Sequence, residues 1–115
     1  MARTLIQIYE IQSPSQAELC ARAGVDRIGS VALSPDDPGI AAVAETARAA
    51  KSMGLSTSLI PLFSGPDDVF KLLERVDPDV VHFCESLTGP AAVPLSSAVG
   101  LQEEVGRRFP HILRM

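Results

Sequence analysis

Side chains able to move protons gather in two short clusters, at positions 9–10 and 82–85 of this 115-residue chain. Glu10 and Cys84 are candidate bases, whereas the phenol of Tyr9 is a poor proton acceptor at neutral pH and a better hydrogen-bond donor. We favour the Glu10 carboxylate as the base, because the thiol has no cationic partner that the sequence identifies. With His82 to orient a neighbour, the two clusters predict general acid–base chemistry.

The two clusters can meet if each one ends a strand of the same parallel sheet. Alternation with a period of two places Gln7 beside Tyr9 on one face of a strand at 5–11, and His82 beside Cys84 on one face of a strand at 79–83. We expect both faces to point into a barrel and to form a polar interior layer. The predicted catalytic residues are Glu10, Tyr9 and Cys84, and the predicted substrate-binding residues are Gln7, Ser34, His82 and Glu85.

A repeated unit organises the rest of the chain: a Gly, Asp or Pro closes a helix-like run, and an apolar strand follows at once. It recurs at residues 23–28, 53–59, 76–81 and 109–113. The pattern predicts strands at 5–11, 26–33, 55–63, 79–83 and 111–115, separated by helices at 13–23 and 40–53, from about 66 to 76, and at 97–109. Strands that alternate with helices in this way indicate βαβ units and a parallel sheet.

Two parallel architectures fit this alternation, a (βα) barrel and an open doubly wound sheet. The segment after the first strand, residues 11–15, lacks the Gly-rich phosphate loop of a nucleotide-binding doubly wound fold. The third strand ends at 61–64 without the acidic residue that a phospho-receiver domain needs. A barrel, whose site is built at the carboxyl ends of its strands, is favoured. Because the fifth strand has barely begun at Met115, we predict that residues 1–115 form a partial α/β domain, truncated at its C-terminus: (βα)4 plus the start of strand five, the N-terminal half of a TIM-type (β/α)8 barrel.

Composition limits the possible partners and location. The net charge is −4 and the ten Lys and Arg form no stripe, so nucleic acid is not expected as a partner. No apolar stretch approaches the roughly 20 residues that span a bilayer, and no signal peptide is recognisable. We therefore expect a cytoplasmic protein with no membrane partner, in which Cys20 and Cys84 are free thiols. We predict no cofactor and no bound metal, because the chain offers no recognised ligand spacing.

Several segments carry a family resemblance that covers nearly the whole chain: residues 6–11, the alanine-glycine turn at 23–29, Leu33-Ser34-Pro35, and residues 79–83. Together they resemble phosphoribosylanthranilate isomerase, a (β/α)8 barrel of tryptophan biosynthesis. That family converts an aminoaldose phosphate into an aminoketose phosphate by an Amadori rearrangement. The resemblance implies aldose–ketose isomerisation of a phosphorylated aminosugar when the barrel is complete.

The chain departs from this family at its chemical positions. The family's first strand reads Lys-x-Cys-Gly-Ile, with the Cys as general base, and Tyr9 stands in the place of that Cys. No arginine in 35–38 matches the one that holds the anthranilate carboxylate, and the family's Gln-Leu-His-Gly becomes residues 82–85. The family's general acid and phosphate loops lie beyond Met115. We therefore expect residues 1–115 alone to be inactive, and Glu10 or Cys84 to take the C2 proton in a complete protein.

Two other functions stay open. A non-catalytic barrel that binds a phosphorylated small molecule or a protein partner agrees with the loss of the family's Lys, Cys and Arg. A half-barrel that forms a homodimer agrees with open strand edges, which invite pairing. Each candidate residue also has a structural alternative: Tyr9 as a packed aromatic, Glu10 as a solvated strand end, His82 as a hydrogen-bonded interior residue, and Cys84 as a small core residue. Cys20 is assigned to packing.

Overall fold

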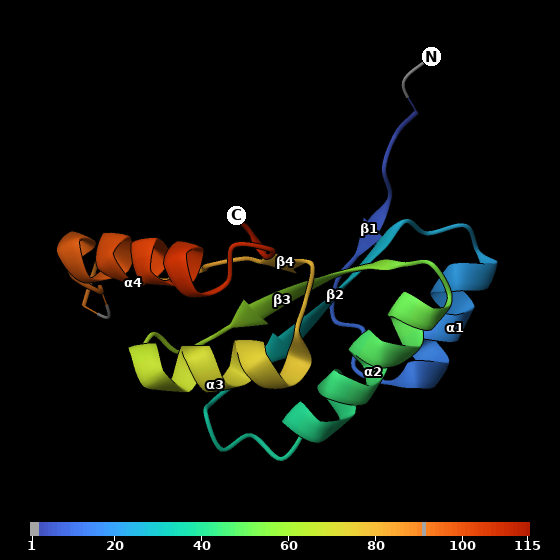
Figure 1. Ribbon diagram of the computed structural model, residues 1–115, viewed down its shortest axis with the longest axis horizontal. Helices are drawn as coiled ribbons and strands as arrows, with labels where there is room; N and C mark the ends of the chain where they lie inside the picture. Colours follow the sequence, from blue (N-terminus) through green and yellow to red (C-terminus); the bar gives the residue numbers. More distant parts are fainter. Residues whose placement is uncertain (1–2, 91) are drawn as a thin grey trace.

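The computed structural model describes residues 3–90 and 92–115, which form one parallel sheet with helices packed around its outside (Figure 1). The strands are β1 (Gln7–Ile8), β2 (Arg27–Ala32), β3 (Ser56–Pro61), β4 (Val80–Val81) and β5 (Leu113–Arg114). The helices are α1 (Pro14–Arg22), α2 (Ile40–Ser52), α3 (Pro66–Val76) and α4 (Leu95–Arg108). None of these helices is both long and apolar enough to cross a membrane.

The strands pair in sequence order, β1-β2-β3-β4-β5, and every pair is parallel. A doubly wound sheet reverses its strand order part-way through, and this sheet does not. Each of β1 to β4 is followed by a helix that returns the chain to the same end of the sheet, and Figure 1 shows α1 to α4 succeeding one another around it. The predicted fold class is confirmed: the chain has the architecture of the N-terminal half of a TIM-type barrel.

The strands at the two edges are shorter than predicted. β1 covers Gln7–Ile8 instead of 5–11, because Glu10 adopts a left-handed conformation (φ 61°) that interrupts the extended backbone.

Two other elements also differ from the predicted bounds. β3 ends at Pro61, which has no N–H to donate. α4 begins at Leu95, two residues before the predicted start, directly after the extended Pro94.

The core lies between the sheet and the helices, and the predicted apolar faces are buried as expected. The largest cluster joins α2, α3 and α4 to β2, β3 and β4, while a smaller one lies under α1 and contains Cys20, as predicted. At the outer edge of the large cluster, the Arg108 guanidinium lies 4.3 Å from the centre of the Phe70 ring. The buried predicted residues are Ile40, Val43, Ala44 and Ala47 on α2, Val69, Leu72, Leu73 and Val76 on α3, and Leu101, Val105 and Phe109 at α4.

The predicted limits of α1 are also confirmed. The Ser13 hydroxyl accepts a hydrogen bond from the backbone N–H of Gln16 at 3.3 Å, as an N-cap does. The Gln16 side chain accepts from the N–H of Gln12 at 2.9 Å, one residue earlier than in a standard capping box. After the helix, Gly24 takes a φ of 84°, a conformation that favours glycine.

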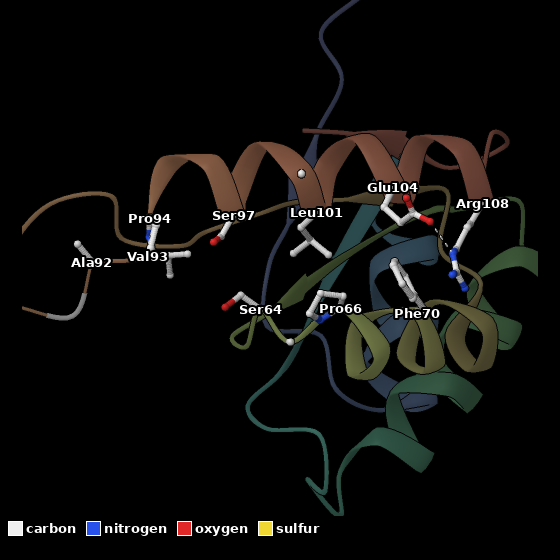
Figure 2. A pocket seen from close by; sticks show the side chains of 12 residues that line it. Ser64, Pro66, Phe70, Ala92, Val93, Pro94, Ser97, Leu101, Glu104 and Arg108 are labelled. Carbon is white, nitrogen blue, oxygen red and sulfur yellow. Dashed lines mark hydrogen bonds and ion pairs between the residues drawn. The ribbon is translucent and has the colours of Figure 1, made fainter.

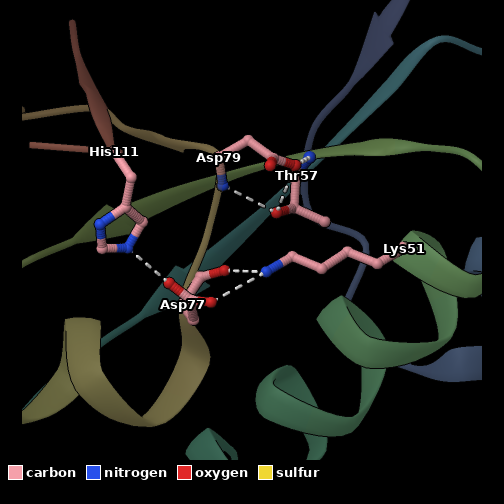
Figure 3. Close-up of polar contacts among 5 residues, drawn as sticks. All are labelled: Lys51, Thr57, Asp77, Asp79 and His111. Atoms are coloured by element: carbon pink, nitrogen blue, oxygen red, sulfur yellow. Dashed lines mark hydrogen bonds and ion pairs between the residues drawn. The ribbon is translucent and has the colours of Figure 1, made fainter.

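Aspartates at the amino ends of two strands align each strand with its neighbour (Figure 3). The carboxylate of Asp79, just before β4, accepts from the N–H of Thr57 at 2.8 Å and from its hydroxyl at 3.2 Å. Asp26, just before β2, accepts from the N–H of Ile6 at 2.8 Å in the same way. The unit β3-α3-β4 therefore repeats the unit β1-α1-β2, including the hydrogen bond from a backbone N–H to the aspartate before the second strand.

A third aspartate at the same end of the sheet connects three elements (Figure 3). Asp77, at the C-cap of α3, lies 2.9 Å from His111 Nε2, and Lys51 at the end of α2 contacts both its carboxylate and its carbonyl. The hydrogen bond from His111 lowers the pKa of Asp77, with a smaller lowering contribution from Lys51. All three side chains are substantially exposed, so this contact orders a surface and contributes modestly to stability.

Candidate functional site

A cavity of about 580 Å³ opens at the carboxyl ends of the strands, the edge at which barrel proteins carry their sites. Two of the predicted catalytic residues, Glu10 and Cys84, contribute to its wall. The rest of the wall combines apolar side chains from β2 and β3 with polar groups from the neighbouring loops. The lining residues are Glu10, Gln12, Val31, Leu33, Asp37, Gly39, Ile60, Leu62 and Cys84.

Glu10 enters this cavity from the segment directly after β1. Its left-handed backbone conformation costs a non-glycine residue about 1–2 kcal/mol, so the surrounding structure has to hold it in place. The neighbouring Gln12 supplies part of that support, because its side-chain amide accepts from the N–H of Val31 at 2.8 Å and donates to the carbonyl of Val31 at 3.0 Å. Within the described residues the Glu10 carboxylate makes no hydrogen bond, which leaves it available to a ligand.

Tyr9 and His82 meet across the inner face of the sheet, although β2 and β3 lie between their strands. The Tyr9 hydroxyl lies 3.2 Å from His82 Nδ1, and the two ring centres are 6.2 Å apart with an interplanar angle of 51°. The phenol donates to Nδ1 when the imidazole is neutral and carries its proton on Nε2. The two predicted clusters are thus joined by a hydrogen bond at the mouth of the half-barrel.

Cys84 and Glu85 lie between this cavity and a smaller one of about 250 Å³. Cys84 is exposed and lines both cavities, so it is not the small core residue of the structural alternative. Glu85 lines the smaller cavity, and its Oε1 atom is buried without a hydrogen-bond partner among the described residues. A ligand with an N–H or O–H donor would satisfy that oxygen.

The structure places two predicted binding residues away from the cavity. Gln7 lies at the opposite end of the sheet, where its side-chain oxygen accepts from Arg27 Nη1 at 3.3 Å. Ser34 lies in the loop after β2, and its carbonyl accepts from the N–H of Asp37 at 3.1 Å. Neither residue contributes to the cavity wall, and of the seven predicted site residues only Glu10 and Cys84 do. Glu85 lines the smaller cavity instead, and Tyr9 and His82 line neither.

Two residues of the cavity wall were not predicted as site residues, Gln12 and Asp37. The Asp37 carboxylate accepts from the N–H of Leu33 at 3.0 Å and from the N–H of Gly39 at 2.8 Å. These backbone hydrogen bonds lower the pKa of Asp37, so it presents a fixed negative charge beside the cavity. In the sequence, the signal for Asp37 is its place in the turn-rich segment Ser34-Pro35-Asp36-Asp37-Pro38-Gly39.

Metal chemistry has no cluster of ligands to support it in this part of the chain. Among residues 3–90 and 92–115, no group of three or more His, Cys, Asp and Glu side chains is placed to hold a metal ion. The described wall of the cavity at the carboxyl edge holds carboxylate, amide and thiol side chains around apolar ones.

The largest cavity, about 820 Å³, lies elsewhere, between α3 and α4 on the outside of the sheet (Figure 2). Its centre is apolar, with Phe70 on α3 and Leu101 on α4 facing each other. At one end the Glu104 carboxylate is paired with Arg107 and, at 3.0 Å, with Arg108. Because the Glu104 carboxylate is already paired with two guanidinium groups, the described part of this groove offers no unpaired carboxylate, and the mouth of the half-barrel remains the candidate site.

A parallel sheet whose strands alternate with helices, with acid–base residues at its carboxyl edge, is typical of TIM-type barrel proteins. This chain has the architecture of half of such a barrel. Comparison with protein-family models and with curated protein sequences finds no match. Comparison with solved structures finds similar proteins.

The chain is similar to N-(5'-phosphoribosyl)anthranilate isomerase from Pyrococcus furiosus, with a TM-score of 0.69 and 16% sequence identity over 98% of this chain and 50% of that one. It is also similar to TrpF from Jonesia denitrificans, with a TM-score of 0.65 and 16% identity over 97% of this chain and 50% of that one. The chain thus spans half the length of the solved structures that it matches. At this identity the likeness establishes the fold, and the activity has to be argued from the site.

Proposed function

We propose that this chain supplies half of a barrel enzyme that isomerises a phosphorylated aminosugar, with Glu10 as the base. The observation that carries the proposal is the cavity at the carboxyl edge of the sheet, which is lined by a carboxylate that makes no hydrogen bond within the described residues. The hydrogen-bonded phenol–imidazole pair lies on the inner face of the same sheet, outside the wall of that cavity. The fold it shares with an isomerase of known structure supports the same reaction class.

The residues have complementary roles in such a reaction. Aldose–ketose isomerisation removes the proton from C2 and returns a proton to C1, while the C2 hydroxyl becomes a carbonyl. Glu10 would take the C2 proton, because it is the cavity's carboxylate without a hydrogen-bond partner in the described chain. The Tyr9–His82 pair would hydrogen-bond a sugar oxygen on which charge develops. Cys84 lines the same cavity and would contact the substrate.

The test is the Glu10→Gln variant, which keeps the size of the side chain and removes its basicity. The assay uses the complete protein that contains this half-barrel, with an aminoaldose phosphate as substrate. We expect kcat to fall by about 10²–10⁴-fold, the usual contribution of a general base. Glu18→Gln is the matched control, since Glu18 is an exposed residue of α1 paired only with Arg22. An unchanged rate in Glu10→Gln would remove Glu10 as the base. Absence of turnover in the unmodified protein would remove the proposed reaction.

A second candidate function, assembly of half-barrels, is favoured by apolar side chains at the β1 edge. Ile6 and Ile8 are 49% and 41% exposed, and Leu19 on the adjacent α1 is 66% exposed. An apolar edge of this kind is a site for another chain to pair with the sheet. Light scattering on the purified chain tests this: a dimer that Ile8→Glu converts to monomer supports assembly through this edge, and a monomer at all concentrations excludes it.

A further inference from the structure

Gly29 occupies the one position on β2 that the Tyr9 ring covers. The register of β1 and β2 pairs Gln7 with Arg27 and Ile8 with Ile28, which brings Tyr9 beside Gly29 on the inner face of the sheet. A Cβ atom on Gly29 would lie 2.6 Å from Tyr9 Cδ1 and 3.0 Å from Tyr9 Cε1. Real Cβ atoms do not approach an aromatic carbon so closely, so any side chain at this position displaces the ring.

The backbone of Gly29 does not itself require glycine. Its φ is not positive, unlike those of Gly24, Gly54 and Gly89, so alanine fits the strand conformation there. The three atoms nearest to a Cβ at Gly29 all belong to the Tyr9 ring. This makes the contact between the two residues a specific one that can be tested separately from strand geometry.

The ring needs this space because Tyr9 has to reach across two strands. The register continues from Gly29 to Ser58 on β3 and from Ser58 to Val80 on β4, and His82 follows Val80 by two residues on the same face. Both residues on the intervening strands, Gly29 and Ser58, are small and buried. They leave room for the phenol to end 3.2 Å from His82 Nδ1.

We propose that Gly29 is a positioning residue of the site: it gives the Tyr9 ring the room to hold the His82 imidazole through Nδ1 and so to present Nε2–H to a bound sugar oxygen. Among the described residues, Nε2 of His82 has no partner of its own, whereas Nδ1 is held by the phenol. A phenol that donates to Nδ1 leaves the imidazole proton on Nε2 and restricts the orientation of the ring. The catalytic part of this inference rests on the proposed function, and the positioning part does not.

The positioning part is measured on the chain without substrate, from the nitrogen resonances of its imidazoles. The chain has two histidines, and His111, bound to Asp77 at the other end of the sheet, is an internal reference. We expect Gly29→Ala and Tyr9→Phe to displace the Nδ1 resonance of His82 in the same direction and to leave both His111 resonances in place. Ser58→Ala is the matched control, because Ser58 Oγ has no partner to lose among the described residues, and it should move neither.

The outcomes separate this inference from the proposed reaction. An unmoved His82 resonance in folded Gly29→Ala overturns the inference. If Gly29→Ala does not fold, the variant is made in a Tyr9→Ala background, where recovery of folding supports the contact and failure to fold overturns it. In the complete protein that contains this half-barrel, Gly29→Ala should lower kcat for an aminoaldose phosphate by about tenfold with little change in KM, which is less than the roughly 10²–10⁴-fold that an acid–base group itself contributes. Displaced resonances without turnover in the unmodified protein refute the reaction while supporting the positioning.

Discussion

Removal of the Asp79 carboxylate tests whether the amino ends of the strands hold the half-barrel together. In Asp79→Ala the N–H of Thr57 loses its acceptor at 2.8 Å, and the Thr57 hydroxyl loses a second contact at 3.2 Å. Thr57 is only 3% exposed, so water cannot replace the lost acceptor. A buried donor left without a partner costs about 1–3 kcal/mol, and a hydrogen bond to a charged group contributes about 1.5–3 kcal/mol. These figures overlap, and we expect a loss of about 2–4 kcal/mol in the free energy of unfolding.

Urea denaturation followed by circular dichroism measures this loss. With a slope of about 2 kcal/mol/M, inside the range of about 1–3 kcal/mol/M for a small domain, the midpoint should fall by about 1–2 M at an unchanged slope. Glu74→Ala, at an exposed position of α3, is the control and should stay within about 0.5 kcal/mol. If Asp79→Ala unfolds at the same urea concentration as Glu74→Ala, the carboxylate does not hold β3 against β4 and the reasoning is wrong.

Three further changes test other parts of the fold. Leu73→Ala should cost about 2–5 kcal/mol, because the side chain is fully buried in the large cluster; a cost below 1 kcal/mol in urea would contradict that packing. Gly100→Ala should raise the thermal midpoint, by a stability gain of about 0.5–1 kcal/mol, since the residue lies inside α4 with nothing within 4 Å of a new Cβ; a lower midpoint would refute this. His111→Ala should lower stability by less than about 1 kcal/mol for so exposed a contact. Because the pKa of Asp77 is lowered below its ordinary value of 3.8, its contribution is present above that pH and is lost as the pH falls, so the difference from wild type should shrink in acid.

The helices and the strand order could be predicted because local rules and tertiary packing agree. Ser13 and Gly24 mark both ends of α1 by their own chemistry, and the apolar stripe of α3 matches its buried face. The strand ends were less predictable. Glu10 leaves the extended conformation although nothing in its type requires it, and single-partner edge strands have fewer hydrogen bonds to define their length.

Only those features of the site that follow from the alternation of side chains along a strand could be predicted. A period of two places Tyr9 and His82 on faces that point inward, and the structure shows that they meet. Whether they touch depends on the space over β2, which is decided by the absence of a side chain at Gly29. Gln12 and Asp37 escaped prediction because each one bonds to backbone atoms, Gln12 to Val31 on β2 and Asp37 to the loop after β2. Such bonds depend on a local backbone geometry that composition does not reveal.

The acidic residues of this chain divide their roles according to the end of the sheet at which they lie. At the amino ends, Asp26 and Asp79 are engaged by backbone N–H groups of the preceding strand, so their charge is already used in aligning the sheet. At the carboxyl ends, Glu10 and Glu85 line cavities, and Glu85 keeps a buried oxygen without a partner in the described chain. Asp37 is the exception at the carboxyl end, because the backbone N–H groups of Leu33 and Gly39 hold its carboxylate. A carboxylate whose oxygens already accept backbone hydrogen bonds has less capacity left for a ligand. Substitutions of Asp26 and Asp79 should therefore change the free energy of unfolding, whereas isosteric substitutions of Glu10 and Glu85 should leave it nearly unchanged and act on ligand binding or turnover.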